Sequence, residues 1–371
     1  MRILLVANVA KELVLKFNMP TLEYLKKQGH IVDVACADAQ IVQNCHEKFA
    51  IPLKRTPYSF GTLRAIIKLK SIIKTREYDV VYCHTPVGGC VARLAARKLR
   101  KSGLKVVYFS HGYHFYKGAP LLNWVLYYTL EKIMARWTDA IITINQEDYN
   151  NTVKRLKCKN TYKLDGIGVD INRFAGTQKI SVRQQYREQL GIPDDAIVMV
   201  YLAELIPNKN QKLLIDGLLQ LREWGYNYYL VLAGIDYNHG RELQYANGIG
   251  VKDYVKYLGW REDIENLYAM SDICTASSIR EGFGINIVEA MASGLPVVAT
   301  NNRGHVTIIR DGVNGLLVPL GKPELMAKKI LFAMQNKDEL LSHYSLKQYE
   351  SSEIVRNIEK ILQDTVDMRH E

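Results

Sequence analysis

Short runs of apolar and often β-branched residues alternate with longer amphipathic segments along the whole chain. The runs of the first half are RILLVAN, IVDVACA, DVVYCHT, KVVYFSH and AIITIN, and those of the second half are AIVMVYLA, YYLVLAG, YVKYLG, ICTAS, PVVAT and GLLVPL. Strands that alternate with helices are typical of parallel sheets covered by helices on both faces. A polar stretch over residues 176–195 separates the two series. The pattern therefore predicts two doubly wound, Rossmann-like α/β domains with a cleft between them.

The length of the chain agrees with two domains, because 371 residues are too many for one ordinary core. We expect an N-terminal domain over residues 1–180 and a C-terminal domain over residues 181–349, with a helix at about 350–371 that packs back on the first. No apolar run approaches the ~18 residues of a membrane-spanning helix. The opening MRILLVANVA is short and is followed by Lys11 and Glu12, so we interpret it as a buried first strand and not as a signal peptide.

The net charge of +11 is distributed unevenly along the chain. Residues 1–175 contain 28 Lys and Arg against 13 Asp and Glu, whereas residues 176–371 contain 21 against 25. The excess is concentrated in two predicted basic helices over residues 63–76 and 92–105, where basic and apolar residues interleave. Such a face can lie on an anionic membrane, bind nucleic acid or simply be solvated. No nucleic-acid-binding motif accompanies the charge, so nucleic acid is not expected as a partner.

The six cysteines form no CxxC pair and have no histidines at metal-ligand spacing. Neither a zinc site nor a disulfide framework is indicated, which favours a reducing cytoplasm.

A candidate ligand site lies in the stretch EGFGINIVE, which begins at Glu281 and follows the predicted strand ICTAS. Gly282 and Gly284 permit a tight turn and the close approach of backbone N–H groups to a ligand, and the helix predicted from about Ile285 offers its positive end to a phosphate. Glu281 and Glu289 can each accept hydrogen bonds from pairs of hydroxyls, as on a sugar. The alternative is a β-turn followed by a helix with two solvated glutamates.

The sequence EGFGINIVEAMASGLPVVAT, followed by RDGVNGLLV, resembles the signature region of retaining glycosyltransferases of family 4. Its two glutamates have the spacing of that family's E-x7-E motif. The similarity extends through GIGVDINRF, PNKNQKLLI, LVLAG and KYLGWREDIENLYAMSDI. The resemblance implies a GT-B fold of two Rossmann-like domains and the transfer of a sugar from a nucleotide diphosphate donor.

The resemblance assigns the donor to the C-terminal domain. It implies that Lys209 holds the diphosphate, that the turn Gly282, Phe283 and Gly284 and the residue Glu289 contact the donor, and that Glu281 acts catalytically on the sugar. The sequence departs from the family at Glu204, where a second basic residue is expected, and at Thr307, where an acid is common. The first predicted loop, ANVAKELVLKFNMP, lacks the family's glycine pair.

In the N-terminal domain, the segment SHGYHFYKGAP follows the predicted strand KVVYF. The resemblance implies that His111 is the family's histidine near the donor sugar, whereas His114 is taken as structural. A second strand-end loop contains His84, Gly88 and Gly89, which we place on the acceptor side. The segment SHGYHFYKGAP resembles in particular the branch that builds bacterial capsular polysaccharide, exopolysaccharide or O-antigen units on a polyprenyl diphosphate lipid.

Together these features predict a glycosyltransferase that moves a sugar, from a UDP-sugar, to a polyprenyl-diphosphate-linked saccharide with retention of configuration. No cofactor and no metal are expected, because no Asp-x-Asp follows a strand and Lys209 with a helix end can supply positive charge. The enzyme is expected in the cytoplasm, held peripherally on the anionic inner face of the membrane by its basic helices. The alternatives are an inactive nucleotide-sugar-binding subunit that supports a partner transferase, and a GT-B nucleotide-sugar epimerase or hydrolase.

Overall fold

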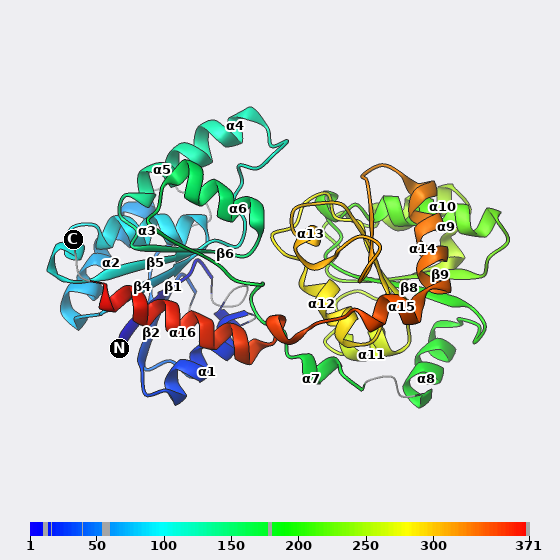
Figure 1. Cartoon of the computed structure of the whole chain (residues 1–371), viewed down its shortest axis with the longest axis horizontal. Helices are drawn as coiled ribbons and strands as arrows, with labels where there is room; N and C mark the ends of the chain where they lie inside the picture. Colours follow the sequence, from blue (N-terminus) through cyan, green and yellow to red (C-terminus); the bar gives the residue numbers. More distant parts are fainter. Residues whose placement is uncertain (10–13, 16, 39, 54–59, 177–179, 369–371) are drawn as a thin grey trace. The chain divides into compact units, whose positions relative to one another are not determined.

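The computed structural model describes residues 1–9, 14–15, 17–38, 40–53, 60–176 and 180–368. The chain divides into two compact units, the first formed by Met1–Gly168 with Ser351–Glu371 and the second by Val169–Glu350 (Figure 1). The first boundary lies twelve residues before the predicted residue 180. Val169 already belongs to the second unit, because its backbone N–H donates to the Tyr349 carbonyl at 2.8 Å and it forms a parallel bridge with Glu350.

Unit 1 is built on a parallel seven-stranded sheet in the order β3-β2-β1-β4-β5-β6-β7. Its strands are β1 (Arg2–Val6), β2 (Ile31–Cys36), β3 (Lys48–Ala50), β4 (Val80–His84), β5 (Lys105–Phe109), β6 (Ala140–Thr143) and β7 (Asn160–Lys163). Almost every residue of β1, β2, β4, β5 and β6 is buried, since helices cover both faces of the sheet. The apolar runs of the first half thus form the central strands.

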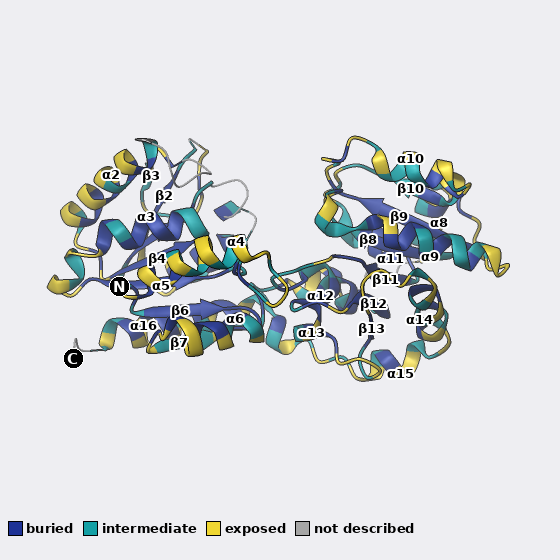
Figure 2. Cartoon of the chain, turned by 90° about the horizontal axis from the view of Figure 1, so that it is seen from above, coloured by how far each residue is buried: buried dark blue, intermediate teal, exposed yellow. Residues whose placement is uncertain are grey.

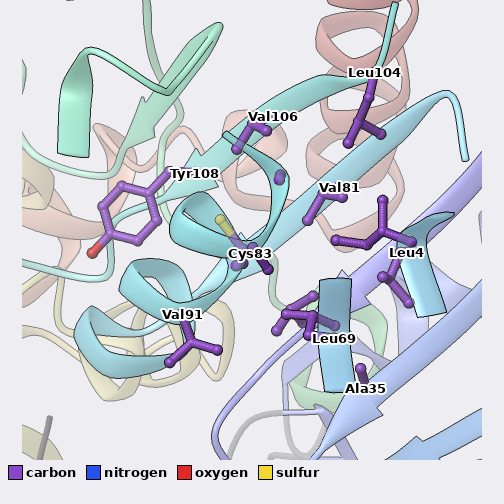
Figure 3. Close-up of a cluster of buried hydrophobic side chains, with 14 of the residues drawn as sticks. Leu4, Ala35, Leu69, Val81, Cys83, Val91, Leu104, Val106 and Tyr108 are labelled. Carbon is purple, nitrogen blue, oxygen red and sulfur yellow. The ribbon is translucent and has the colours of Figure 1, made fainter. Parts of the chain in front are cut away.

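One face of this sheet is covered by α2, α3 and α5, and the other by α1 and α16 (Figure 1). The helical elements of unit 1 are α1 (Met19–Lys27), α2 (Phe60–Arg76), α3 (Pro86–Ala96), η2 (Leu99–Ser102), α4 (Leu121–Asn123), the π-helical turn η3 (Trp124–Tyr128), α5 (Thr129–Ala135), α6 (Gln146–Asn151), the π-helical turn η4 (Thr152–Leu156) and α16 (Ser351–Asp367). Side chains of β1, β4 and β5 pack against α2 and α3 in one core, with Leu4, Leu69, Val81, Val91 and Val106 among its members (Figure 3).

The prediction of a single basic helix over residues 92–105 is wrong. Helix α3 ends at Ala96, and the chain then passes through η2 and Gly103, whose φ of 102° is left-handed, into β5. Arg93 is fully buried and forms a bidentate ion pair with Glu131, with nitrogen to oxygen distances of 2.7 and 3.1 Å. Two further bases of this segment are also paired, Arg100 with Asp139 and Lys105 with the Met368 carbonyl. Half of the six basic residues of this segment are therefore paired within unit 1, while Arg97, Lys98 and Lys101 are exposed.

Unit 2 has a parallel six-stranded sheet in the order β10-β9-β8-β11-β12-β13. Its strands are β8 (Ile197–Leu202), β9 (Tyr228–Ala233), β10 (Val255–Tyr257), β11 (Ile273–Ala276), β12 (Val297–Thr300) and β13 (Leu316–Val318). Its helical elements are α7 (Ile171–Phe174), α8 (Ile180–Leu190), η5 (Pro207–Lys209), α9 (Gln211–Glu223), α10 (Arg241–Gly248), η6 (Lys252–Tyr254), α11 (Ile264–Ala269), α12 (Ile285–Ala292), α13 (His305–Ile308), α14 (Pro323–Gln335), α15 (Lys337–Ser342) and η7 (Lys347–Tyr349). Helices α9 and α14 pack together on one face of the sheet, and α12 packs on β11 and β12.

Candidate active site

The predicted site residues, except His111, follow the strands at which the order of each sheet reverses. In unit 1 the chain runs outward from β1 to β3 and returns to β4 on the other side of β1, and in unit 2 it does the same at β8 and β11. The loops after two such strands diverge, and open α/β sheets bind their ligands beyond the carboxyl ends of the strands at this point. His84 ends β4, Lys209 lies in the loop after β8, and Glu281 lies in the loop after β11. The motifs therefore coincide with the edges at which the topology leaves room for a ligand.

In unit 2, Lys209 and Glu281 contact each other directly. The Lys209 Nζ lies 2.5 Å from the Glu281 Oε1, and the Ser278 hydroxyl donates to the same oxygen at 2.6 Å. Burial alone would raise the pKa of the Glu281 carboxyl, but the Lys209 ammonium and the two hydrogen bonds outweigh it and lower the pKa below its ordinary value. Glu281 is therefore ionised at neutral pH, and it holds the ammonium at the strand edge.

Three hydrogen bonds tie the loop after β8 to the loop after β11. The side-chain amide of Asn208 donates to the Arg280 carbonyl at 2.9 Å, and the Ile279 N–H donates to the Asn208 carbonyl at 2.8 Å. The Ser277 hydroxyl donates to the carbonyl of Lys209 at 2.8 Å. The backbone under the Lys209–Glu281 pair is thus fixed from both sides, which preorganises the pair.

The glycine turn before α12 has the predicted form. Gly284 is the N-cap of α12 with φ of 115°, and a Cβ atom there would lie 3.1 Å from the His305 Cδ2, so this position needs glycine. Helix α12 begins at Ile285, and its first N–H groups face the carboxyl edge of β11. The Phe283 side chain is buried and its ring centroid lies 5.7 Å from that of Tyr349, so Phe283 has only its backbone to offer a ligand.

Glu289 lies about one turn into α12, the helix predicted from about Ile285. It is the fifth residue of the helix and is half-buried. The Tyr268 hydroxyl lies within hydrogen-bonding distance of both the Glu289 Oε2, at 3.1 Å, and the Asn286 carbonyl, at 3.0 Å. This tyrosine holds the carboxylate close to the start of the helix.

Two residues after β12, Arg303 in the loop and His305 at the start of α13, join this edge and were not predicted as site residues. Arg303 donates from its Nε to the Glu281 carbonyl at 3.3 Å, and buried His305 lies against Gly284. Burial lowers the pKa of His305 to about 4, so its ring is neutral at pH 7. Only the fold reveals this neighbourhood, since more than twenty residues separate Arg303 from Glu281.

Glu204, which stands where the resemblance expects a basic residue, is exposed. Within the described residues, no ion pair involves its carboxylate. A cation does lie at this edge in the form of Arg303, so positive charge is not limited to Lys209.

In unit 1, His84 and His111 form a pair at the carboxyl ends of β4 and β5. The His84 Nδ1 lies 3.1 Å from the His111 Nε2, and the Phe109 ring packs against both rings with centroid distances of 5.4 and 4.7 Å. His84 is 1% exposed, whereas His111 is partly exposed. Burial lowers the pKa of His111 to about 4 and that of His84 well below its ordinary value. Both rings are neutral at physiological pH.

The loop from His84 into α3 is strained and tightly packed. Thr85 has φ of 62°, an unfavourable value for a β-branched residue that costs about 1–3 kcal/mol, and its hydroxyl lies 3.1 Å from the Asn8 Oδ1 after β1. A Cβ atom on Gly88 would lie 2.8 Å from the Thr85 Oγ1, and one on Gly89 would lie 2.6 Å from the Tyr108 ring. Close packing alone therefore explains why glycine stands at positions 88 and 89. Their placement on the acceptor side stays a prediction, as does that of buried His84.

The segment after His111 is anchored to the rest of unit 1. The Tyr113 N–H donates to the Asp148 carboxylate at 3.1 Å, and the Asn123 side chain donates to the His114 carbonyl at 3.0 Å. The His114 ring stacks on Tyr127 with centroids 4.6 Å apart. A small hollow beside this segment is lined by Pro86, Tyr108, Gly112, Tyr113, His114, Phe115, Tyr127, Leu130 and Glu131. The anchored loop therefore presents His111 next to an aromatic-walled recess.

In the described ranges, no three His, Cys, Asp or Glu side chains are grouped to hold a metal ion. Over the same residues no helix combines the length and the apolar character needed to cross a bilayer. All six cysteines are free thiols. Independence from metals and cofactors stays a prediction. The glycine-free first loop lies partly outside the described residues, at 10–13 and 16.

Comparison with known proteins identifies the family. Residues 2–145 match a family model described as "Glycosyl transferase 4-like", and residues 182–351 match "Glycosyl transferases group 1". The putative glycosyltransferase EpsD of Bacillus subtilis is 43% identical over 316 residues, which is 85% of this chain and 82% of that protein. The chain belongs to the group 1 glycosyltransferases. This confirms the predicted family and the enzyme class.

Two further comparisons support the fold and the branch of this glycosyltransferase. The structure of HepE from Anabaena, determined with UDP and glucose, covers 98% of the chain at a TM-score of 0.80 and 22% identity, and the chain covers all of it. This confirms the GT-B fold of two Rossmann-like domains. The capsular polysaccharide biosynthesis glycosyltransferase CapM of Staphylococcus aureus is 24% identical over 90% of both chains. The roles of the individual site residues in this glycosyltransferase stay predictions.

Proposed function

We propose that this glycosyltransferase transfers a sugar from a UDP-sugar to a lipid-linked saccharide in the synthesis of a bacterial surface polysaccharide, with retention of configuration. The observation that carries the proposal is the contact between Lys209 and Glu281 at the point where the order of the second sheet reverses. It is supported by two relatives. The HepE structures contain UDP or UDP-glucose, and an enzyme of Escherichia coli that is 24% identical over 82% of this chain is named a UDP-Gal:α-D-GlcNAc-diphosphoundecaprenol α-1,3-galactosyltransferase.

In this proposal the donor lies at the carboxyl edge of the unit 2 sheet. The Lys209 ammonium and the first N–H groups of α12 offset the charge that grows on the diphosphate as it departs. Glu289, held by Tyr268, accepts hydrogen bonds from the ribose hydroxyls. The Glu281 carboxylate lies where it can stabilise positive charge that builds on the sugar ring, and its lowered pKa keeps it ionised for that role.

The acceptor side is proposed for unit 1, with the aromatic recess beyond β5, and His111 at the end of that strand is proposed to contact the donor sugar. A neutral imidazole can donate a hydrogen bond to a hydroxyl or to a developing oxyanion without adding a full charge. Neutral His111 is therefore suited to orient a sugar hydroxyl.

The transfer test uses the purified enzyme, a panel of radiolabelled nucleotide sugars and membranes from a strain that lacks this protein. We expect label from one UDP-sugar to enter the lipid fraction and to depend on an intact Glu281. Release of free sugar without any lipid acceptor, or label that enters no lipid with any donor, would contradict the proposal. The anomeric configuration of the product, determined by NMR, decides whether the reaction retains it.

We also propose that an anionic membrane is the surface on which the enzyme meets its acceptor. The predicted helix over residues 92–105 does not form, but another exposed segment supports membrane contact. It runs from α4 through η3 to α5 in unit 1 (Figure 2). Leu121, Leu122 and Val125 on this segment are 79%, 63% and 56% exposed. Lys132 and Arg136 are exposed on the same stretch, and its single carboxylate, Glu131, is buried. An apolar face with basic flanks and no exposed acid fits an interface of anionic lipids.

Helix α2 adds basic and apolar residues in the same helical layer. Arg64, Lys68 and Lys74 are exposed, and Leu63 and Ile67 are 59% and 62% exposed. Flotation with phosphatidylglycerol vesicles tests the proposed surface. Leu122→Asp with Val125→Asp should abolish flotation, whereas Phe332→Asp, a matched change at an exposed aromatic in unit 2, should not. Equal flotation of all variants, or binding that does not weaken with salt, would count against this surface.

A further inference from the structure

His84 is the inner member of the histidine pair and reaches no solvent. It ends β4 opposite Phe109 in the register with β5, and His111 follows two residues later. The His84 side chain therefore contacts the ring of His111 and the Phe109 and Tyr82 rings, with the Tyr82 centroid 4.4 Å away. Only His111 extends from this cluster toward solvent. A ligand can be reached by His84 only through His111.

The surroundings of His84 decide which of its nitrogens carries the proton. The His84 Nε2 is buried and has no hydrogen-bond partner, while the Nδ1 faces the His111 Nε2 at 3.1 Å. A proton on the Nε2 would leave a buried N–H without an acceptor, which is rarer in native proteins than a buried acceptor without a donor. The proton of His84 therefore sits on the Nδ1 and is donated to His111.

This arrangement also determines the tautomer of His111. Burial keeps both rings neutral, so only one proton lies between them. The His111 Nε2 accepts the hydrogen bond from the His84 Nδ1–H. Because a neutral imidazole carries one proton, the proton of His111 must then be on its Nδ1. The Nδ1 of His111 makes no hydrogen bond to the described residues. It is free to donate to a ligand oxygen.

We propose that His84 is a positioning residue that fixes the tautomer and ring orientation of His111, so that His111 presents an N–H donor to the substrate. The strained backbone of Thr85 supports this role, because it directly follows His84 and is tied through its hydroxyl to Asn8 at the end of β1. The catalytic consequence rests on the proposed function of His111, whereas the tautomer does not.

The tautomer is tested first by NMR of the full chain with 15N-labelled histidine, without substrate. Wild-type His111 should show a protonated Nδ1 and an unprotonated Nε2. His84→Asn should keep this signature, because the side-chain nitrogen of Asn can occupy the place of the histidine Nδ1. His84→Phe should produce a mixture of tautomers. The matched control Tyr82→Phe, which removes a buried hydroxyl without a partner in the same cluster, should change nothing. Wild-type His111 protonated on the Nε2, or a tautomer unaffected by His84→Phe, would overturn the inference.

Kinetics then test the positioning role. His84→Phe should lower kcat roughly five- to tenfold, the effect of losing one neutral hydrogen bond, with little change in the KM for the nucleotide sugar. His84→Asn should restore kcat, and His84→Gln, whose amide nitrogen lies farther out, should not. Thermal unfolding of each variant separates this effect from loss of fold. If His84→Phe shifts the tautomer but leaves kcat unchanged, the positioning role is overturned. If the wild type transfers no sugar, the proposed function fails, while the NMR result still decides the tautomer.

Discussion

Replacing Glu281 by Gln should affect donor binding and turnover in opposite directions. The carboxylate holds the Lys209 ammonium at 2.5 Å, and any diphosphate that binds Lys209 must compete with it. Gln keeps the shape and most of the hydrogen bonding of Glu281 but removes the negative charge. The variant should therefore free the lysine for phosphate while losing the charge that stabilises the reacting sugar.

The magnitude follows from the burial of the pair. The side chains of Lys209 and Glu281 are 22% and 17% exposed, so the pair lies between an exposed ion pair, worth about 0–1 kcal/mol, and a buried one, whose disruption costs about 3–5 kcal/mol. We expect a coupling of about 1–2 kcal/mol, of which about 1 kcal/mol appears as fivefold tighter binding of UDP. Turnover should fall by about 10²–10³, as for the loss of one preorganised electrostatic contact.

Isothermal calorimetry with UDP and initial rates at saturating donor measure the two effects. Ser278→Ala is a matched control, because it removes the other hydrogen bond to the Glu281 Oε1 but leaves the charge, and UDP affinity should stay within about twofold. Weaker UDP binding by Glu281→Gln would show that Glu281 holds the nucleotide and does not compete for Lys209. Full turnover would remove Glu281 from the reacting centre.

Three further predictions concern the same edge of unit 2. Lys209→Ala should weaken UDP binding by about 1.5–3 kcal/mol in calorimetry, the worth of a charge-assisted hydrogen bond, and equal affinity would exclude contact with the diphosphate. Glu289→Ala should raise the KM for the donor and leave kcat nearly unchanged, whereas a loss confined to kcat would argue against a ribose contact. His305 has a pKa of about 4 in the folded chain and about 6.5 when unfolded, so the unfolded state binds its proton first as the pH falls. About 2 kcal/mol of stability should therefore be lost between pH 7 and pH 5, and urea unfolding of His305→Asn should show a smaller loss.

The fold could be predicted because its central strands are continuous apolar runs. A strand needs apolar side chains on both of its sides only when helices cover both faces of the sheet. The edge strands were missed, since β3 (KFA) and β7 (NTYK) are short and partly polar. Helix α8 was missed for a related reason. It lies in the polar stretch 176–195 and, among its described residues, buries little besides Arg187, which pairs with Asp272.

The candidate site could be predicted residue by residue but not as a set of contacts. Glu281, Glu289 and Lys209 were found from motifs, whereas the bond between Lys209 and Glu281 joins residues 72 positions apart. The interpretation of residues 92–105 was wrong for the same reason. Helical spacing places Arg93 on a solvated face, and its partner Glu131 lies 38 residues away, where no local pattern indicates it.

The return of α16 to unit 1 determines the order in which the two units can be completed during synthesis. Residues 169–350 all leave the ribosome before α16, so unit 2 has its whole sequence while unit 1 still lacks a helix. Ile354, Val355, Ile358, Ile361 and Leu362 of α16 are buried, and the helix packs on α1 and β5. Until α16 is made, the part of the unit 1 sheet that it covers next to α1 stays open to water and to chaperones. A chain that stops before Ser351 should therefore expose its amino-terminal half to protease while its middle stays protected.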